Sequence, residues 1–326
     1  MKPQWQQEMI KSFRTLPSLL EFLELSERPY FNQLIENPTF PLIVPLAFAE
    51  KMEKGKISDP LLLQVLPQQK ENEQFVNFTT DPVGDFSSKN DSGMIHKYNN
   101  RILLPITGNC AINCRYCFRQ HYPYEETSYN SDRLNQSIQY ILDHPEIDEI
   151  ILSGGDPLSL NDDILKQILT KLNTLEQISV IRFHTRFPVV IPSRLTNTLS
   201  EILSKLDKQI IFVFHINHPN EIDSVFKTYL TTFKSNQMLY LNQAVLLKGI
   251  NDSYKILSEL SRKLIQFGIS PYYLNQLDKV KGAAHFEVSV THGKKLIEQL
   301  RTTLSGYMVP RYIQEVAGEQ SKTVLL

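Results

Sequence analysis

The 326-residue sequence has only three cysteines, no long hydrophobic run and almost no net charge. No apolar stretch reaches the length needed to span a membrane, and residues 1–13 lack the apolar core of a signal peptide. The formal net charge of -1 argues against a protein held on nucleic acid by bulk electrostatic attraction. We therefore predict a soluble, cytoplasmic protein that binds neither membrane nor nucleic acid.

The length and composition are those of an ordinary globular protein. Hydrophobic residues make up 41% of the chain and charged residues 21%. A chain of this length buries a sizeable core without help from disulfides or a structural metal. It has room for one large α/β barrel or for two ordinary domains.

All three cysteines fall within one short segment, at Cys110, Cys114 and Cys117. An odd, clustered set without a secretory signal argues against disulfides. The C-x3-C-x2-C spacing places three thiolates on one loop, where they can bind three irons of a [4Fe-4S] cluster and leave the fourth iron open. A zinc site is the main alternative, because His121 could complete a Cys3His set. Unliganded thiols are the third possibility.

From residue 101 onward, apolar and β-branched runs alternate with helix-like stretches. The strand-like runs are 101–107, 149–154, 179–185, 209–216, 238–247 and 269–275. The helix-like stretches are 131–143, 161–174, 194–206, 219–233, 253–267 and 289–303. This alternation predicts an α/β fold with a parallel sheet covered by helices, and right-handed sequential connections would curl it into a partial (β/α)6 barrel. Reactive residues in such barrels lie at the C-terminal ends of the strands.

The remaining segments divide the chain into three parts. Residues 1 to about 75 are predicted to form helices interrupted by prolines, and residues 71–100 are polar and rich in turn formers. We therefore predict an N-terminal helical region with a connecting segment over 1–95, the barrel over 96–288, and a last helix with a short C-terminal segment over 289–326.

Polar residues gather at the predicted strand ends. The glycine pair in residues 154–156 is typical of a plain turn, but next to a cysteine loop it would let backbone groups approach a ligand. His215 ends the fourth strand and is followed closely by His218, where a helix N-cap region using Asn217 or Asn220 and a metal site of the two histidines are alternatives. Asn242 and Gln243 interrupt an apolar run, so a buried amide there needs a partner. Asp278 follows the sixth strand and is interpreted as an acceptor for a cationic group.

Four further residues are less informative by themselves. Arg119 follows the last cysteine closely, and its guanidinium suits a carboxylate through two parallel hydrogen bonds, although a lone arginine is commonly a surface charge. Tyr98 and Arg101 flank the start of the first predicted strand and indicate nothing when taken singly. Lys322, near the C-terminus, would ordinarily be a solvated surface charge.

In combination, these residues resemble those of the lysine 2,3-aminomutases, which are radical S-adenosylmethionine (SAM) enzymes that also use pyridoxal 5′-phosphate (PLP). The resemblance runs from about His96 to Thr323 and includes the segments HPNE, NQAVLLKGIND, PYYLNQLDKVKGAAHF and SGYMVP. It is strongest to the bacterial branch that supplies β-lysine for the modification of elongation factor P. Residues before 90 match only loosely, chiefly at 81–83.

The resemblance implies a [4Fe-4S] cluster, SAM and PLP as cofactors, and the isomerisation of L-α-lysine to β-lysine. It implies that the cluster is bound by Cys110, Cys114 and Cys117, and that SAM is bound by Gly154, Gly155, Asp156, His215 and Gln243. It implies that PLP is bound by Tyr98, Arg101 and, covalently, Lys322. For the substrate, it implies that Arg119 binds the carboxylate and that Asp278 and Glu315 bind the distal ammonium. It also implies an electron donor of the flavodoxin or ferredoxin type and a functional link to elongation factor P and its lysyl ligase.

Two features depart from the clostridial members of that family. Glu315 stands where they have aspartate, so the added methylene moves one anchor for the ammonium and would alter efficiency or stereochemistry toward free lysine. They also continue into a cysteine-bearing zinc segment that joins subunits, whereas this sequence ends at Leu326, so we do not expect their tetramer. A 2,3-aminomutase for another amino acid and a non-catalytic Cys3His zinc module remain the alternatives.

Overall fold

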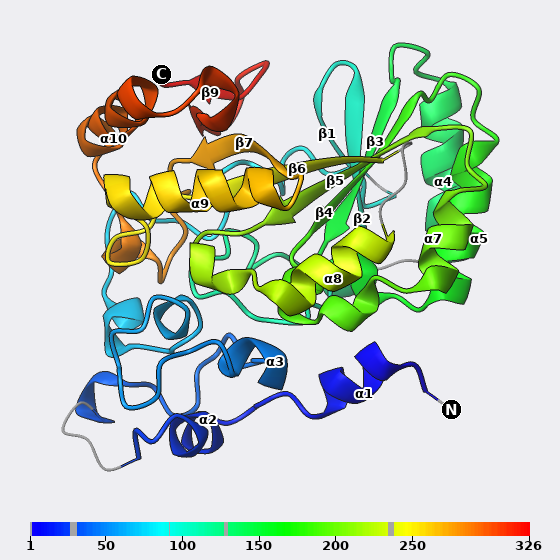
Figure 1. Ribbon diagram of the computed structural model, residues 1–326. Helices are drawn as coiled ribbons and strands as arrows, with labels where there is room; N and C mark the ends of the chain where they lie inside the picture. The colour runs from blue at the N-terminus through cyan, green and yellow to red at the C-terminus, as the bar shows by residue number, and fades with distance from the viewer. Residues whose placement is uncertain (1, 27–30, 91, 127–129, 234–237) are drawn as a thin grey trace.

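A computed structural model describes residues 2–26, 31–90, 92–126, 130–233 and 238–326. Within these ranges the fold is built on a single sheet whose strands follow one another in chain order (Figure 1). The strands are β1 (Ile95–Tyr98), β2 (Arg101–Thr107), β3 (Glu149–Gly154), β4 (Val180–Thr185), β5 (Gln209–His215), β6 (Met238–Val245), β7 (Ser270–Asn275), β8 (Arg311–Gln314) and β9 (Thr323–Val324). Strands β2 to β8 are parallel, while β1 and β9 run antiparallel at the two edges.

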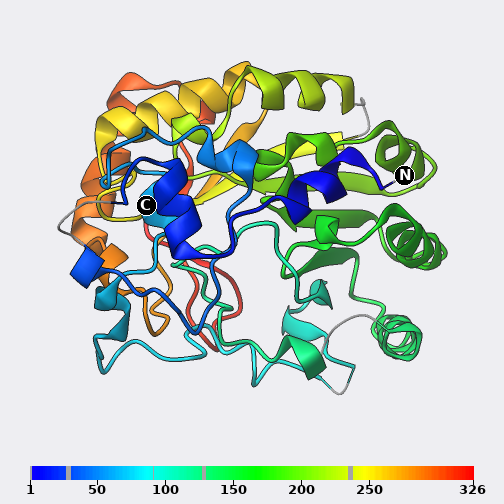
Figure 2. The same cartoon turned by 90° about the horizontal axis from the view of Figure 1, so that it is seen from below.

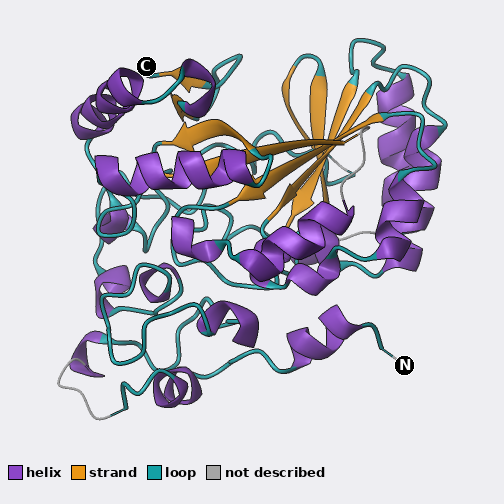
Figure 3. Cartoon of the chain, viewed as in Figure 1, coloured by secondary structure: helices purple, strands orange, loops and turns teal. Residues whose placement is uncertain are grey.

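Helices fill the connections between the parallel strands and lie against the outside of the sheet (Figure 3). The helices are α1 (Gln4–Ile10), α2 (Leu16–Phe22), α3 (Leu46–Ala49), α4 (Ser131–Leu142), α5 (Asp162–Asn173), α6 (Phe187–Val190), α7 (Asn197–Leu203), α8 (Ser224–Phe233), α9 (Tyr254–Gln266) and α10 (Val290–Thr303). In the described part of the chain, none of them is long and apolar enough to cross a membrane.

Side-chain caps begin most of the helices that cover the sheet. A side-chain oxygen of the residue before the first turn accepts a backbone N–H three residues further on, which satisfies a donor that the helix itself leaves free. These capping residues are Asn130, Asn161, Thr196, Ser253 and Ser289. The caps explain why the helices start within a few residues of the predicted positions.

The predicted alternation of strands and helices is confirmed, and the sheet is longer than predicted. Each of the six predicted strands and the six predicted helices has a counterpart, although α8 begins later than predicted because residues 219–221 form a 3-10 turn first. Strands β1, β8 and β9 were not predicted, because they are short and lie in polar sequence. The fold is therefore a mixed α/β fold with a mostly parallel sheet, and among the described residues β1 and β9 stay at separate edges rather than closing a barrel.

Aromatic side chains hold the middle of the sheet together. The rings of Phe183 and Phe212 stack across β4 and β5 at 5.1 Å, and those of Phe214 and Tyr240 stack across β5 and β6 at 6.0 Å. All four residues are almost completely buried. This packing makes the strand ends a rigid platform for the loops that follow them.

The N-terminal region lies below the sheet in Figure 1, and Figure 2 shows it from that side. The predicted helices are present there but short, and 3-10 turns and loops separate them. Buried leucines of this region, such as Leu19, Leu61 and Leu62, belong to the same apolar core as the strands. The region therefore packs as part of the fold.

The same region fastens the cysteine loop, which we define as residues 108–119. The Asn113 amide N–H donates to the Ile43 carbonyl at 3.1 Å, and the Arg115 amide N–H donates to the Gln64 carbonyl at 2.9 Å. The Arg115 guanidinium is buried and binds both carboxylate oxygens of Glu71. Because the loop has no strand or helix of its own, these contacts determine its shape.

We predict that Glu71→Gln destabilises the fold. The change leaves the buried Arg115 guanidinium without its counter-charge, and breaking a buried pair on one side costs about 3 kcal/mol or more. Urea denaturation should therefore show a lower free energy of unfolding. The matched control is Lys54→Gln, which breaks the exposed pair with Glu24 and should change little. Equal losses in the two variants would contradict a fastening role for the buried pair.

Candidate active site

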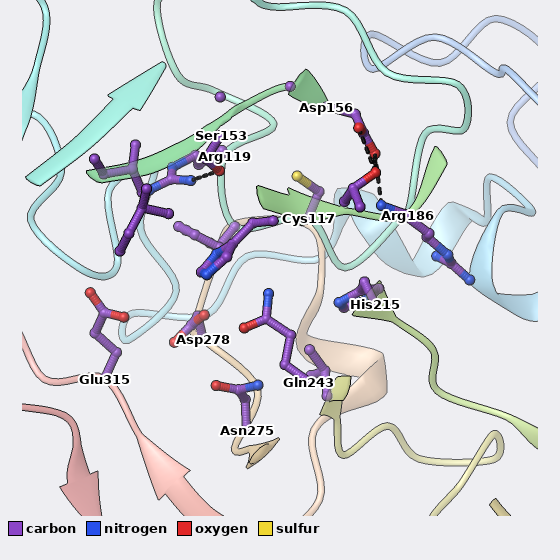
Figure 4. A pocket seen from close by; sticks show the side chains of 18 of the residues that line it. Cys117, Arg119, Ser153, Asp156, Arg186, His215, Gln243, Asn275, Asp278 and Glu315 are labelled. Atoms are coloured by element: carbon purple, nitrogen blue, oxygen red, sulfur yellow. Dashed lines mark hydrogen bonds between the residues drawn. The ribbon is translucent and has the colours of Figure 1, made fainter. Parts of the chain in front are cut away.

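A cavity of about 500 Å³ is lined by residues from β1 to β7, the cysteine loop and the C-terminal segment. Figure 4 shows part of its lining. Every residue to which the resemblance gives a role lines this cavity: Tyr98, Arg101, Cys110, Cys114, Cys117, Arg119, Gly154, Gly155, Asp156, His215, Gln243, Asp278, Glu315 and Lys322. Residues that are far apart in the sequence thus come together in one place, and most of them follow or end a strand, as the strand-end rule anticipates.

The three cysteines line the cavity and are free thiols. Burial raises the pKa of Cys117 to about 12, and it also raises the pKa of Cys110. Thiols in such surroundings ionise only when a cation stabilises the thiolates, so the donor set suits a metal centre. Among the described residues no three His, Cys, Asp or Glu side chains converge on a single-ion site. That finding is compatible with a cluster, in which each cysteine binds a different iron.

The zinc alternative gains no support from the position of His121. Its side chain is exposed and lies outside the cavity lining, and its Nε2 atom is 3.4 Å from the Lys281 carbonyl oxygen. The histidine is therefore turned toward a neighbouring loop instead of completing a set with the thiols.

Gly154 and Gly155 allow the turn after β3 to pack against the cysteine loop. A Cβ atom on Gly155 would lie 2.4 Å from the Asn109 carbonyl oxygen, and one on Gly154 would lie 2.5 Å from that of Thr107. Gly154 also has a φ angle of 114°, which side chains rarely permit. The close approach brings the Gly155 N–H within 2.7 Å of the Thr107 carbonyl. The glycines are thus needed for contact between the turn after β3 and the cysteine loop, besides any approach to a ligand.

The Asp156 carboxylate connects the turn after β3 to the end of β4. It accepts hydrogen bonds from the Thr185 hydroxyl at 2.7 Å and from the backbone N–H groups of Arg186 and Phe187 at 2.7 and 2.8 Å. A further N–H, from Leu158, donates to it at 3.0 Å. The carboxylate is therefore occupied by the protein, and its part in the site is to hold the loop.

His215 lies between the cysteine loop and β6. Its Nε2 atom is 2.9 Å from the Tyr116 hydroxyl, and the two rings stack at 5.7 Å. Burial, with the nearby Arg186 guanidinium, lowers the pKa of His215 to about 3, so the ring is neutral. The buried amide that the sequence left without a partner, Asn242, exchanges hydrogen bonds with the backbone of Ile216.

Lys322 lines the same cavity as the cysteines, so it is not an ordinary solvated surface charge. The side chain is 25% exposed, its Nζ atom is 3.3 Å from a Glu315 carboxylate oxygen, and it lies 5.6 Å from the centre of the Tyr273 ring. The other Glu315 oxygen accepts from Lys97 at 3.0 Å. Burial alone would raise the pKa of Glu315, but the two lysines outweigh that effect and lower it.

A chain of ion pairs connects Lys322 to Arg119 along one wall. Arg119 donates through Nε to Asp85 at 2.7 Å, and the other Asp85 oxygen is 2.5 Å from Lys97, which in turn contacts Glu315. Although burial alone would raise the pKa of Asp85, the Arg119 and Lys97 charges lower it. Asp85 and Lys97 were not identified from the sequence, where they stand in a polar segment beside the loosely matching residues 81–83.

Asp278 lies near Glu315 in the cavity (Figure 4) and has a different charge environment. Burial, followed by the negative charge of Glu315, raises the pKa of Asp278 to about 7. The carboxyl group therefore titrates close to neutral pH, where a cationic ligand would favour its ionised form.

Aromatic rings and arginine surround the Lys322 end. The Arg101 guanidinium lies 4.2 Å from the centre of the Tyr98 ring, and burial raises the pKa of the Tyr98 hydroxyl. Across the cavity the rings of Tyr272 and Tyr273 stack at 3.7 Å. Apolar faces beside a guanidinium suit a flat aromatic ligand that carries an anionic group.

Two buried polar atoms in the cavity lining have no hydrogen-bond partner among the described residues. They are Nε2 of His184 and Nε of Arg186, both on the segment that ends β4. Since buried polar atoms are nearly always paired, the cavity suits ligands with polar groups. The sequence signal for these residues was their polar character at the end of the strand-like run 179–185.

Comparisons with known proteins agree with this geometry. A sequence profile of the Radical SAM superfamily matches residues 104–230. The chain is 43% identical to the L-lysine 2,3-aminomutase of Haemophilus influenzae over 94% of this chain and 90% of that protein. It is 45% identical to the L-lysine 2,3-aminomutase of Escherichia coli, over 88% and 83% of the two chains. With that of Buchnera aphidicola it shares 43% identity over 98% and 95%.

Among solved structures, a radical SAM methyltransferase from Sphaerobacter thermophilus aligns with 68% of each chain, with a TM-score of 0.49 and 15% identity. The family assignment rests on the full-length sequence relatives and not on this structure. The long alignments, together with the cysteine spacing, show that the chain belongs to the lysine 2,3-aminomutase family of radical SAM proteins.

Proposed function

We propose that this protein isomerises L-α-lysine to β-lysine by moving the amino group from C2 to C3. One observation carries the proposal: Lys322 and the three cysteines line the same cavity, in a chain that is 43–45% identical to L-lysine 2,3-aminomutases. A zinc-binding module does not require a lysine in the cavity that contains its cysteines. The aminomutase reaction requires both the three cysteines and this lysine.

The cysteine end would hold the cluster and SAM. Cys110, Cys114 and Cys117 would each bind one iron, and the open iron would receive SAM. Backbone groups at 154–155 and the side chains of His215 and Gln243 would contact SAM, because they line the cavity beside the cysteine loop. Asp156 would act on SAM only through the loop that its carboxylate holds.

The Lys322 end would hold PLP. Lys322 would bind it covalently, Arg101 would pair with its phosphate, and Tyr98 would contact its ring. When bound, the cluster and SAM supply radical chemistry, and PLP supplies the carrier for the migrating amino group. The protein's own contribution is to place both ends of the cavity at a fixed separation and to exclude water between them.

Charged residues of the wall would position the substrate. Arg119 would bind the lysine carboxylate, and Asp85 holds its guanidinium in place through Nε. Asp278 and Glu315 would bind the distal ammonium. Two acidic side chains at that position disfavour glutamate as a substrate, because a second carboxylate would meet like charge. Recognition at both ends would thus set the substrate length.

We also propose a cellular role from the resemblance to the β-lysine-supplying branch. The product would serve the modification of elongation factor P through its lysyl ligase. A flavodoxin or ferredoxin would reduce the cluster. Supplementing cells that lack this protein with β-lysine should restore the modification, and the same cells without supplement should lack it.

The first prediction concerns the reaction itself. Protein reconstituted with iron, sulfide and PLP under anaerobic conditions, then reduced and given SAM and isotopically labelled lysine, should form labelled β-lysine. Nuclear magnetic resonance identifies the carbon that bears nitrogen in the product. Omitting SAM is the control and should abolish conversion. Recovery of unchanged lysine from fully loaded protein would contradict the proposal.

A second prediction tests the covalent lysine. Lys322→Ala should bind a full complement of iron but lose the PLP absorbance that borohydride fixes to the protein, because no other amine is proposed to bind PLP. The control variant is Lys279→Ala, which removes an exposed lysine paired with Glu287 outside the cavity lining and should retain PLP. Covalent PLP in the Lys322 variant would show that the assignment is wrong.

A third prediction follows from the pKa of Asp278. The lysine ammonium remains charged up to about pH 10, whereas Asp278, with a pKa of about 7, is mostly neutral at pH 6 and mostly ionised at pH 8. The KM for lysine should therefore fall several-fold as the pH rises from 6 to 8. Asp278→Asn should raise the KM and flatten this trend, while the exposed Asp163→Asn should preserve it. An identical trend in the Asp278 variant would contradict the role.

A further inference from the structure

We infer that Arg186 is a positioning residue for the iron–sulfur cluster, donating a hydrogen bond to the Cys114 sulfur and thereby raising the reduction potential of the cluster. The inference rests on the proposed function only in requiring a cluster on the three cysteines. It goes beyond that function, because Arg186 is given no role in it.

The contact is short and direct. Arg186 Nη1 lies 2.7 Å from the Sγ atom of Cys114, and the same nitrogen lies 2.6 Å from the Tyr116 hydroxyl. A cysteine sulfur keeps acceptor capacity when it binds iron, so this hydrogen bond is compatible with a bound cluster. An arginine is always protonated, so the donor also brings a full positive charge next to the sulfur.

The guanidinium has little freedom to turn away. Its Nη2 atom donates to Gln64 at 2.7 Å and to Glu221 at 2.9 Å, and Glu221 is completely buried. The Arg186 side chain is itself 6% exposed, and the Phe48 ring lies 5.4 Å away. Its planar group is therefore held by contacts from the N-terminal region on one side and from the loop after β5 on the other.

The position of the Arg186 charge determines whether it raises or lowers the reduction potential of the cluster. Reduction adds a negative charge to the cluster, and a nearby cation stabilises the reduced form more than the oxidised form, strongly so in a buried site. Glu221 opposes this effect, but it binds Nη2, whereas Nη1 is the nitrogen that faces the sulfur. Arg186 should thus make the cluster easier to reduce by an external electron donor.

A matched pair of variants isolates this contribution. Glu221→Gln removes the buried carboxylate and keeps Arg186, and the double variant Arg186→Gln with Glu221→Gln removes both charges without leaving one unpaired. The two proteins differ only at residue 186. After reconstitution with iron and sulfide and without SAM, the midpoint potential of each cluster is measured by a redox titration followed by electron paramagnetic resonance.

The expected result is a lower midpoint potential in the double variant than in Glu221→Gln, at equal iron content. Equal potentials, or a higher one in the double variant, would overturn the inference. Should the double variant take up no cluster, Arg186→Lys replaces it. That variant keeps the charge but loses the planar fork, so its potential should fall below that of the unaltered protein, and an unchanged value would overturn the inference.

The same preparations separate this inference from the proposed function. Unaltered protein that assembles no four-iron cluster would contradict the proposed function without reference to Arg186. Unaltered protein that assembles the cluster and converts lysine, with potentials that do not depend on Arg186, would leave the proposed function intact and remove only the inference.

Discussion

The structure depends on holding a loop of three cysteines that has no regular secondary structure of its own. The loop is fixed from three sides. The N-terminal region binds it through the buried pair of Arg115 and Glu71, the turn after β3 packs against it through Gly155, and the end of β4 reaches it through Arg186. Because each support comes from a different part of the chain, the loop takes its shape only when the whole fold has formed.

The acidic side chains of the cavity lie in different charge environments. Asp85 and Glu315 each lie between two cations, and their pKa values are lowered. Asp278 has a carboxylate as a close neighbour and a raised pKa. The acidic group that lacks a fixed partner is therefore the one best suited to receive a cation from outside. A buried charge without a partner is costly, so a ligand that supplies the opposite charge is favoured there.

The sequence predicted most of the sheet but only part of the site. The apolar runs predicted six strands, and each of them is present in the structure. The cysteine spacing predicted three thiols on one loop, and all three line the same cavity. Lys322 is different, because nothing in its surroundings in the sequence distinguishes it from a surface lysine, and only the resemblance pointed to it. No role was assigned to Asp85 from the sequence, and only the polar character at the end of the strand-like run 179–185 set Arg186 apart. Their partners, Arg119 and Glu221, lie more than 30 residues away in the chain, so local sequence does not reveal these buried pairs.

The N-terminal region has a larger part in the site than its loose sequence resemblance suggests. The predicted division at residue 95 falls inside β1. The Gln64 side chain accepts hydrogen bonds from Arg186, which contacts Cys114, and from the Tyr116 hydroxyl. Segments on both sides of that division thus share buried hydrogen bonds. Removing residues 1–72 would leave the Arg115 and Arg186 guanidinium groups without several of their acceptors, and buried cations without acceptors are costly. The region therefore belongs to the scaffold that would make cluster binding possible.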